Sequence, residues 1–80
     1  MFSTEIFGQR LRAARKAHNE KQEDLGRLLG VGKSQVSELE RGTASTPLEK
    51  LSLICEHYNV SADYLLGLTD EPRPYKRKKN

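Results

Sequence analysis

Gly30 and Gly32 interrupt a helical pattern in the middle of the chain and divide it into two short segments. Apolar residues recur at helical spacing on both sides of the interruption. A left-handed backbone at Gly30, which glycine adopts without strain, would let the chain turn sharply there. We therefore expect two short helices, over about residues 22–29 and 33–41, and we expect Gly42 to end the second. Gly26 should lie where the two helices pack closely. The apolar residues that would lock them together are Leu25, Leu29, Val31, Val36 and Leu39.

Two further helices are expected towards the ends of the chain. The first covers about residues 5–17, with apolar residues at helical spacing, and ends near Asn19, because asparagine tolerates the left-handed conformation used at helix ends. The last is short, over residues 62–66. Ser61 would cap it and Gly67 would end it.

Thr46, Pro47 and Glu49 predict the start of one more helix. Thr46 would be the cap, Pro47 suits the first helical position, and Glu49 would complete a capping box. This helix would run to about His57, and the residues expected on its buried face are Leu48, Leu51, Ile54, Cys55 and Tyr58. Since no segment has the alternation of a strand, we predict an all-α fold, a compact domain of five helices.

The length and composition of the chain fit one small domain. Eighty residues, 35% of them hydrophobic, allow a thin helical core, which in a chain this short often gains stability from a partner subunit. No apolar run approaches the ~18 residues of a membrane span, and the first residues have no signal-peptide core. A single cysteine, Cys55, fits a reducing compartment, so we expect a cytoplasmic protein with no membrane partner.

The positive charge of the chain is concentrated at its end. The net charge is +3, yet residues 1–70 carry nine Lys and Arg against ten Asp and Glu. The last ten residues carry five basic side chains against one acidic side chain. We therefore expect a domain over residues 1–68 and a basic, disordered tail over residues 69–80. The tail could be a nonspecific DNA arm, a linker to a further C-terminal domain, or a solubilising end.

The second of the two central helices would carry a polar outward face. Its members are Lys33, Ser34, Ser37, Glu38 and Arg41. Such a face is slim enough to enter the major groove of DNA, which is about 12 Å wide, so the pair of helices is interpreted as a helix-turn-helix. The sequence has no nucleophile–base pair, carboxylate cleft or metal-ligand cluster, so we predict no enzymatic activity, no cofactor and no metal.

Four sequence motifs carry a resemblance to a known family. They are Gln22-x-x-Leu25, Leu29-Gly30-Val31, Val36-x-x-Leu39-Glu40-Arg41-Gly42 and Asn59-Val60-Ser61-Ala62-Asp63-Tyr64-Leu65-Leu66-Gly67. Over about residues 7–70 the chain resembles the lambda-repressor-like, Cro-type (XRE) family of phage repressors and bacterial regulators. It departs from the family at Lys21, where a Ser, Thr or Asn cap is usual, and at Glu20, where an apolar residue is common.

The resemblance implies roles for individual side chains. Gln22 would cap its helix and touch a phosphate, and Arg15 would form a buried or half-buried ion pair with Glu40. The residues expected at base edges are Lys33, Ser34, Ser37 and Glu38. The residues expected at phosphates are Lys21, Gln22, Gln35, Arg41 and Thr43. The candidate dimer surface is Tyr64, Leu65 and Leu66, for which ordinary core packing is the alternative.

The expected function is that of a sequence-specific transcriptional regulator, a repressor that binds double-stranded DNA as a homodimer. One helix reads only a few base pairs, so useful specificity needs two half-sites of a palindromic operator about one helical turn apart. The alternative is an antitoxin-like or phage-regulatory module whose main partner is another protein, because the same fold serves both tasks.

Overall fold

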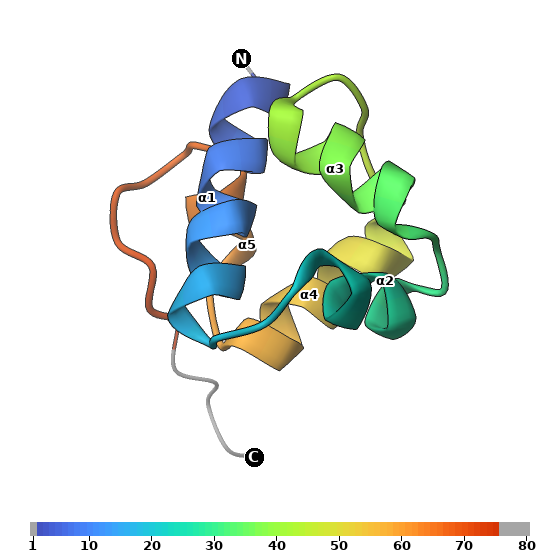
Figure 1. Cartoon of the computed structure of the whole chain (residues 1–80). Helices are drawn as coiled ribbons and strands as arrows, with labels where there is room; N and C mark the ends of the chain where they lie inside the picture. Colours follow the sequence, from blue (N-terminus) through green and yellow to red (C-terminus); the bar gives the residue numbers. More distant parts are fainter. Residues whose placement is uncertain (1, 76–80) are drawn as a thin grey trace.

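The computed structural model describes residues 2–75, and within them the chain forms five helices and no strand (Figure 1). The helices are α1 (Thr4–Ala17), α2 (Gln22–Leu29), α3 (Lys33–Arg41), α4 (Leu48–Tyr58) and α5 (Ala62–Leu65). The predicted all-α, five-helix architecture is confirmed. None of these helices is long and apolar enough to cross a membrane.

Glycines end α2 and α3 at the residues predicted for them. Gly30 follows α2 with a φ of 71°, and Gly42 follows α3 with a φ of 80°. Both values lie in the left-handed region, which glycine adopts without the steric cost of a Cβ atom. Asn19 takes the same conformation after α1, with a φ of 55°. At the other end of α1 the Ser3 side chain accepts a hydrogen bond from the backbone N–H of Ile6, a cap that the sequence analysis missed.

Helix α1 approaches α3 so closely that only glycine fits at the contact. A Cβ atom added at Gly8 would lie 2.5 Å from the backbone oxygens of Leu39 and Glu40. Gly26 has a similar role within the helix-turn-helix, where an added Cβ would lie 2.6 Å from the carbonyl oxygen of Val31. The close approach expected at Gly26 is therefore present, although its partner is the turn rather than α3 itself.

The core lies between all five helices. Its buried apolar members are Phe7, Leu11, Leu25, Leu29, Val36, Leu39, Ile54, Tyr58 and Leu65. Leu65 has no exposed surface at all, so its assignment to a dimer surface is wrong. The side chain of Leu65 closes the core, and a second copy of the chain cannot touch it.

The start of α4 differs from the prediction by one residue. Pro47 occupies the cap position, the helix begins at Leu48, and no side chain caps it, so the predicted Thr46 cap and its capping box are wrong. The extended backbone of Pro47 instead presents its carbonyl oxygen to the N–H of Leu51. Leu48, which we expected in the core, is 81% exposed, because it lies in the first turn of α4, beyond the edge of the core.

Residues 69–75 fold back against the domain instead of forming a disordered tail. After α5 the chain loops beside α1 (Figure 1), where Arg10 donates to the backbone oxygens of Tyr64 and Thr69. The N–H of Ser61 donates to the carbonyl oxygen of Pro72 at 2.9 Å. The expectation of a disordered tail is therefore wrong for residues 69–75, and its basic residues 76–79 lie outside the described residues.

Helix α5 ends one residue before the predicted boundary, with Leu66 as its C-terminal cap. The predicted cap at its start is confirmed, since the Ser61 hydroxyl accepts from the N–H of Tyr64 at 3.0 Å.

Candidate nucleic-acid interface

The polar face of α3 is exposed as a continuous surface beside the first turn of α2. The opposite face of α3 carries Val36 and Leu39 into the core, so the helix is held rigidly from behind. A shallow hollow of about 280 Å³ lies over the exposed face. The residues that line it are Gln22, Lys33, Ser34, Ser37, Glu38 and Arg41. The structure thus brings together all four predicted base-edge residues and two of the predicted phosphate residues.

Within this surface Ser37 and Arg41 are bonded to each other. The Arg41 guanidinium donates to the Ser37 hydroxyl at 2.9 Å, one helical turn away. Lys33, Ser34 and Glu38 are exposed, whereas Ser37 is half-buried. Ser37 is therefore less available to a ligand than its three neighbours.

A buried ion pair lies directly behind the polar face. Arg15 of α1 meets Glu40 of α3 through two bonds, Nε to Oε2 at 2.6 Å and Nη2 to Oε1 at 3.0 Å. Their side chains are only 9% and 3% exposed, as the resemblance implied for this pair. Hydrogen bonding to Glu40 raises the pKa of Arg15, so the guanidinium keeps its positive charge.

Gln22 is linked to this ion pair rather than to its own helix end. Its amide Nε2 donates to Glu40 Oε1 at 3.2 Å. The cap position of α2 is held by Lys21, whose backbone N–H donates to the Asp24 carboxylate at 2.8 Å. The implied capping role of Gln22 is therefore wrong, because Gln22 is already inside the helix and its side chain turns towards α3.

The remaining predicted phosphate residues are spread around the polar face. Lys21 is exposed at the start of α2. Thr43, just after α3, uses its hydroxyl to donate to the backbone oxygen of Glu38 at 3.2 Å. Gln35 is exposed but lines a different hollow, together with Thr46 and Lys50. Gln35 thus lies on another side of α3 from Gln22 and Arg41.

Comparison with known proteins places this arrangement in a family. A sequence model described as helix-turn-helix matches residues 11–65, from within α1 to the end of α5. The chain belongs to the XRE-type helix-turn-helix family.

Relatives of the chain include a transcriptional regulator and an antitoxin. The chain is 43% identical over 75 residues to the uncharacterized HTH-type transcriptional regulator YobD of Bacillus subtilis (strain 168), a match that covers 94% of this chain and 67% of YobD. It is 31% identical over 62 residues to the antitoxin PezA of Streptococcus pneumoniae serotype 4, which covers 78% of this chain but 39% of PezA.

Among solved structures, the chain resembles the c2 repressor protein of phage P22 in complex with a synthetic operator. The TM-score is 0.70 and the identity 35%, and the match covers 75% of this chain and 91% of that one. The similarity concerns one part of that repressor, because the match to the repressor protein C2 of Salmonella phage P22 covers 80% of this chain but only 30% of the repressor.

This helix-turn-helix chain also contains a polar cluster that the sequence analysis did not predict. Glu20, between α1 and α2, accepts from the Tyr58 hydroxyl at 2.7 Å, and its second oxygen lies 2.7 Å from His57 Nε2. Burial acts to raise the pKa of Glu20, but the hydrogen bonds from Tyr58 and His57 outweigh it and lower that pKa. The departure from the family at Glu20 was the signal that could have revealed the cluster, because a carboxylate in an apolar position needs polar partners.

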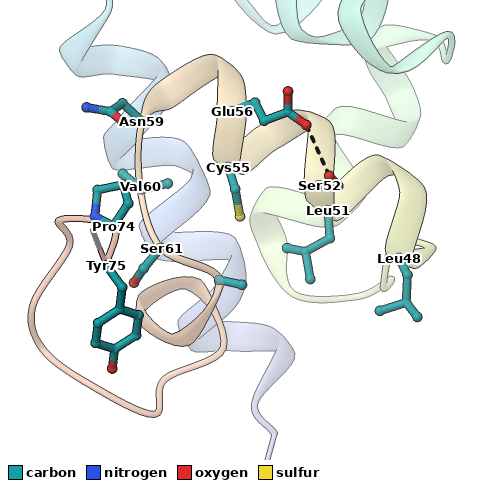
Figure 2. A pocket seen from close by; sticks show the side chains of 11 residues that line it. Leu48, Leu51, Ser52, Cys55, Glu56, Asn59, Val60, Ser61, Pro74 and Tyr75 are labelled. Carbon is teal, nitrogen blue, oxygen red and sulfur yellow. Dashed lines mark hydrogen bonds between the residues drawn. The ribbon is translucent and has the colours of Figure 1, made fainter. Parts of the chain in front are cut away.

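A second exposed surface lies where residues 69–75 return to pack beside α4. It is a groove of about 580 Å³ between α4 and residues 74–75 (Figure 2). Leu48, Leu51 and Cys55 line it from α4, and Pro74 and Tyr75 face them. Burial raises the pKa of the Cys55 thiol, which keeps it protonated and weakly nucleophilic. The expected core role of Cys55 holds only in part, because one side of it borders the groove.

The described residues contain no group of three or more His, Cys, Asp or Glu side chains that could hold a metal ion. His18 and His57 lie near each other, with ring centres 6.4 Å apart, but their partners are Tyr58 and Glu20. The two histidines thus belong to the polar cluster around Glu20.

Proposed function

We propose that this chain is a sequence-specific DNA-binding transcriptional repressor that inserts α3 into the major groove. The observation that carries the proposal is the division of α3 into two faces. One face is buried and fixes the helix, while the other presents four predicted readers beside Gln22 on a single surface. A rigid helix with an exposed polar face is what major-groove readout requires.

The exposed side chains differ in the bases they would favour. Lys33 at the start of α3 can donate to guanine O6 and N7, and Glu38 can accept from the amino group of cytosine. Ser34 can both donate and accept, so it is tolerant of several bases. We therefore expect Lys33 and Glu38 to set most of the base preference.

The repressor would act as a homodimer on a palindromic operator. One α3 helix reads only a few base pairs, so two copies on half-sites about one helical turn apart give useful specificity. With Leu65 in the core, we place the contact with a second copy at Leu66 and the exposed Leu48, which line one hollow with Phe2 and Leu51. Leu48→Glu should then weaken self-association in sedimentation experiments, whereas Leu53→Glu, on α4 but outside this hollow, should not.

Selection from randomised duplexes tests DNA recognition directly. We expect a palindrome to emerge, and we expect Lys33→Ala to relax the preference at defined base pairs, with a loss of about 1–3 kcal/mol for each good base contact. Lys16→Ala removes the same charge from an exposed site on α1 and is the matched control. If no preferred sequence emerges, or if both variants behave alike, specific readout by α3 is wrong.

The similarity to the antitoxin PezA supports a second candidate function, that of a module whose main partner is a protein. The groove beside α4 offers an apolar surface for such a partner. Under this alternative the selection from randomised duplexes yields no preferred sequence, and Lys33→Ala does not change binding to the protein partner. A palindrome that depends on Lys33 would contradict it.

A further inference from the structure

A second hollow opens beside the polar face of α3 and extends it towards α1. Its volume is about 300 Å³. Its lining residues are Arg12, Gln22, Ser37, Glu40 and Arg41. Gln22, Ser37 and Arg41 also line the hollow over α3, so the two hollows form one continuous surface. Arg12 is thereby brought from α1 to the edge of the proposed DNA interface, a position that neither motif nor spacing predicted.

Arg12 and Arg41 differ from the other arginines of the described chain. Residues 2–75 contain six arginines, and four of them form ion pairs with carboxylates. These pairs are Arg10–Asp70, Arg15–Glu40, Arg27–Asp24 and Arg73–Glu71. Within this part of the chain Arg12 and Arg41 have no carboxylate partner, and both are exposed. The two guanidinium groups without an internal counter-charge therefore line the same hollow.

We propose that this hollow binds one phosphate of the DNA backbone, with Arg12 and Arg41 as its charged donors. The proposal rests on the proposed function, because α3 in a groove would place its flank beside the sugar–phosphate strand. Phosphate contacts fix the register of a protein on DNA, and arginine donors give the strongest of them. Two guanidinium groups from different helices would also fix the angle between α1 and the duplex.

The carboxylate of Glu40 lies in the wall of the hollow, yet it does not oppose an anion there. Arg15 neutralises it through two hydrogen bonds, and the Gln22 amide donates to one of its oxygens. An amide nitrogen has two hydrogens, so the second N–H of Gln22 is available to a phosphate oxygen. Glu40 thus acts as a positioning residue that turns the Gln22 amide into the hollow.

Ser37 acts as a positioning residue for Arg41 and not as a base reader. Its hydroxyl accepts a hydrogen bond from Arg41 at 2.9 Å and is half-buried. This contact restrains a long, flexible side chain before DNA arrives, which lowers the entropy lost on binding. The proposal therefore reassigns Ser37 from the base-edge group to the phosphate group.

The test compares Arg12→Gln with Lys16→Gln on the duplex obtained by selection. Both variants remove one exposed positive charge from α1, but only Arg12 lines the hollow. We expect the Arg12 variant to lower the slope of log affinity against log salt by about 0.9 for each bound protomer, with an unchanged base preference. The Lys16 variant should leave the slope unchanged. Equal slopes for the two variants would overturn the proposal.

Neutral methylphosphonate linkages locate the contact on the DNA. One substituted position in each half-site should weaken binding of the original chain and have little further effect on the Arg12→Gln variant. If every substituted position weakens DNA binding by both proteins equally, Arg12 does not contact a particular phosphate and the proposal fails. If the selection yields no specific duplex, the proposed function has failed instead, so the two failures are distinguishable.

The role of Ser37 has its own readout. Ser37→Ala should weaken binding to all sequences by the same factor and leave the selected sequence unchanged, and Ser37→Thr, which keeps the hydroxyl, should restore affinity. A change in the preferred base would show instead that Ser37 reads the groove.

Discussion

Helix α1 is joined to the rest of the molecule at two places, and an arginine holds each of them. At the α1–α3 joint, Arg15 and Glu40 are almost fully buried, beside the close contact at Gly8. At the α1–α5 joint, Arg10 covers the ring of Tyr64 at 4.2 Å and bonds to Asp70, whose side chain is fully exposed. The two joints use the same residue type on the same helix, but the carboxylate partner is buried in one and fully exposed in the other.

The difference between the joints shows what burial does to an ion pair. Water screens the contact between Arg10 and the exposed Asp70, and without that carboxylate the Arg10 guanidinium keeps its bonds to the backbone oxygens of Tyr64 and Thr69. The Arg15 side chain is only 9% exposed, so removing Glu40 would leave a largely buried charge without a carboxylate partner. We therefore expect the α1–α3 joint to govern both stability and the position of the proposed reading surface.

The largest effect is expected from Glu40→Ala. This substitution leaves the buried Arg15 charge without its carboxylate partner. It should lower the free energy of unfolding by about 3–5 kcal/mol, as measured by urea denaturation. Replacing the pair together, as Arg15→Met with Glu40→Leu, should restore part of this loss because no charge is then buried. If Glu40→Ala unfolds no more easily than the original chain, the contrast between the joints disappears.

Gly8→Ala should come next. The added methyl group would lie 2.5 Å from backbone oxygens of α3, and backbone cannot move aside as a side chain can, so α1 and α3 must separate. Overpacking of this kind costs about 1–3 kcal/mol. Gln9→Ala, at the next and exposed position, is the control for the change in helix propensity. A Gly8→Ala variant as stable as this control would show that the joint is loosely packed.

A smaller effect should appear as acid is added, through Glu20. Folding lowers the pKa of this carboxylate, so its stabilising contribution is present above the unfolded value of about 4.3 and is lost as the pH falls through the lower folded value. Glu20→Gln should therefore be less stable than the original chain at pH 7, and the difference should shrink by pH 3. Arg15 also donates to the backbone oxygen of Glu20 at 2.7 Å, and the substitution leaves that bond in place, so the comparison isolates the side-chain contacts with His57 and Tyr58 of α4. A difference that stays constant with pH would contradict the lowered pKa of Glu20.

The smallest effect is expected from Asp70→Asn at the other joint. Its fully exposed side chain should contribute so little that the urea midpoint stays unchanged within error. Arg10 keeps its bonds to the backbone oxygens of Tyr64 and Thr69 in this variant, so the returning chain should remain in place. A clear loss of stability would show that the exposed ion pair at the α1–α5 joint contributes to stability as the buried pair does.

Local signals in the sequence were sufficient for the centre of the fold. The ends of α2 and α3 were predicted to the residue because Gly30 and Gly42 stop a helix through their own backbone conformation. The Arg15–Glu40 pair was implied only by the family resemblance, since spacing alone cannot show that two distant residues meet.

The errors concern features that depend on which elements come to lie nearby. A Thr46 cap was chemically reasonable, but the chain enters α4 one residue later, at Pro47. Leu65 looked available at the end of α5 because nothing in its local sequence reveals that it fills the core. No local pattern in the sequence singles out Arg12, since its proposed role depends on lining the same hollow as Arg41 of another helix.

The position of α1 between α3 and α5 has a consequence for how the chain assembles during synthesis. The partner of Arg15 follows 25 residues later, and the Tyr64 oxygen bound by Arg10 follows 54 residues after that arginine. On a ribosome, α1 emerges first but finds its last partners only when α5 has left the exit tunnel. The domain therefore gains its cooperative structure late in translation, and a nascent chain cut short before Leu65 is a ready substrate for proteases.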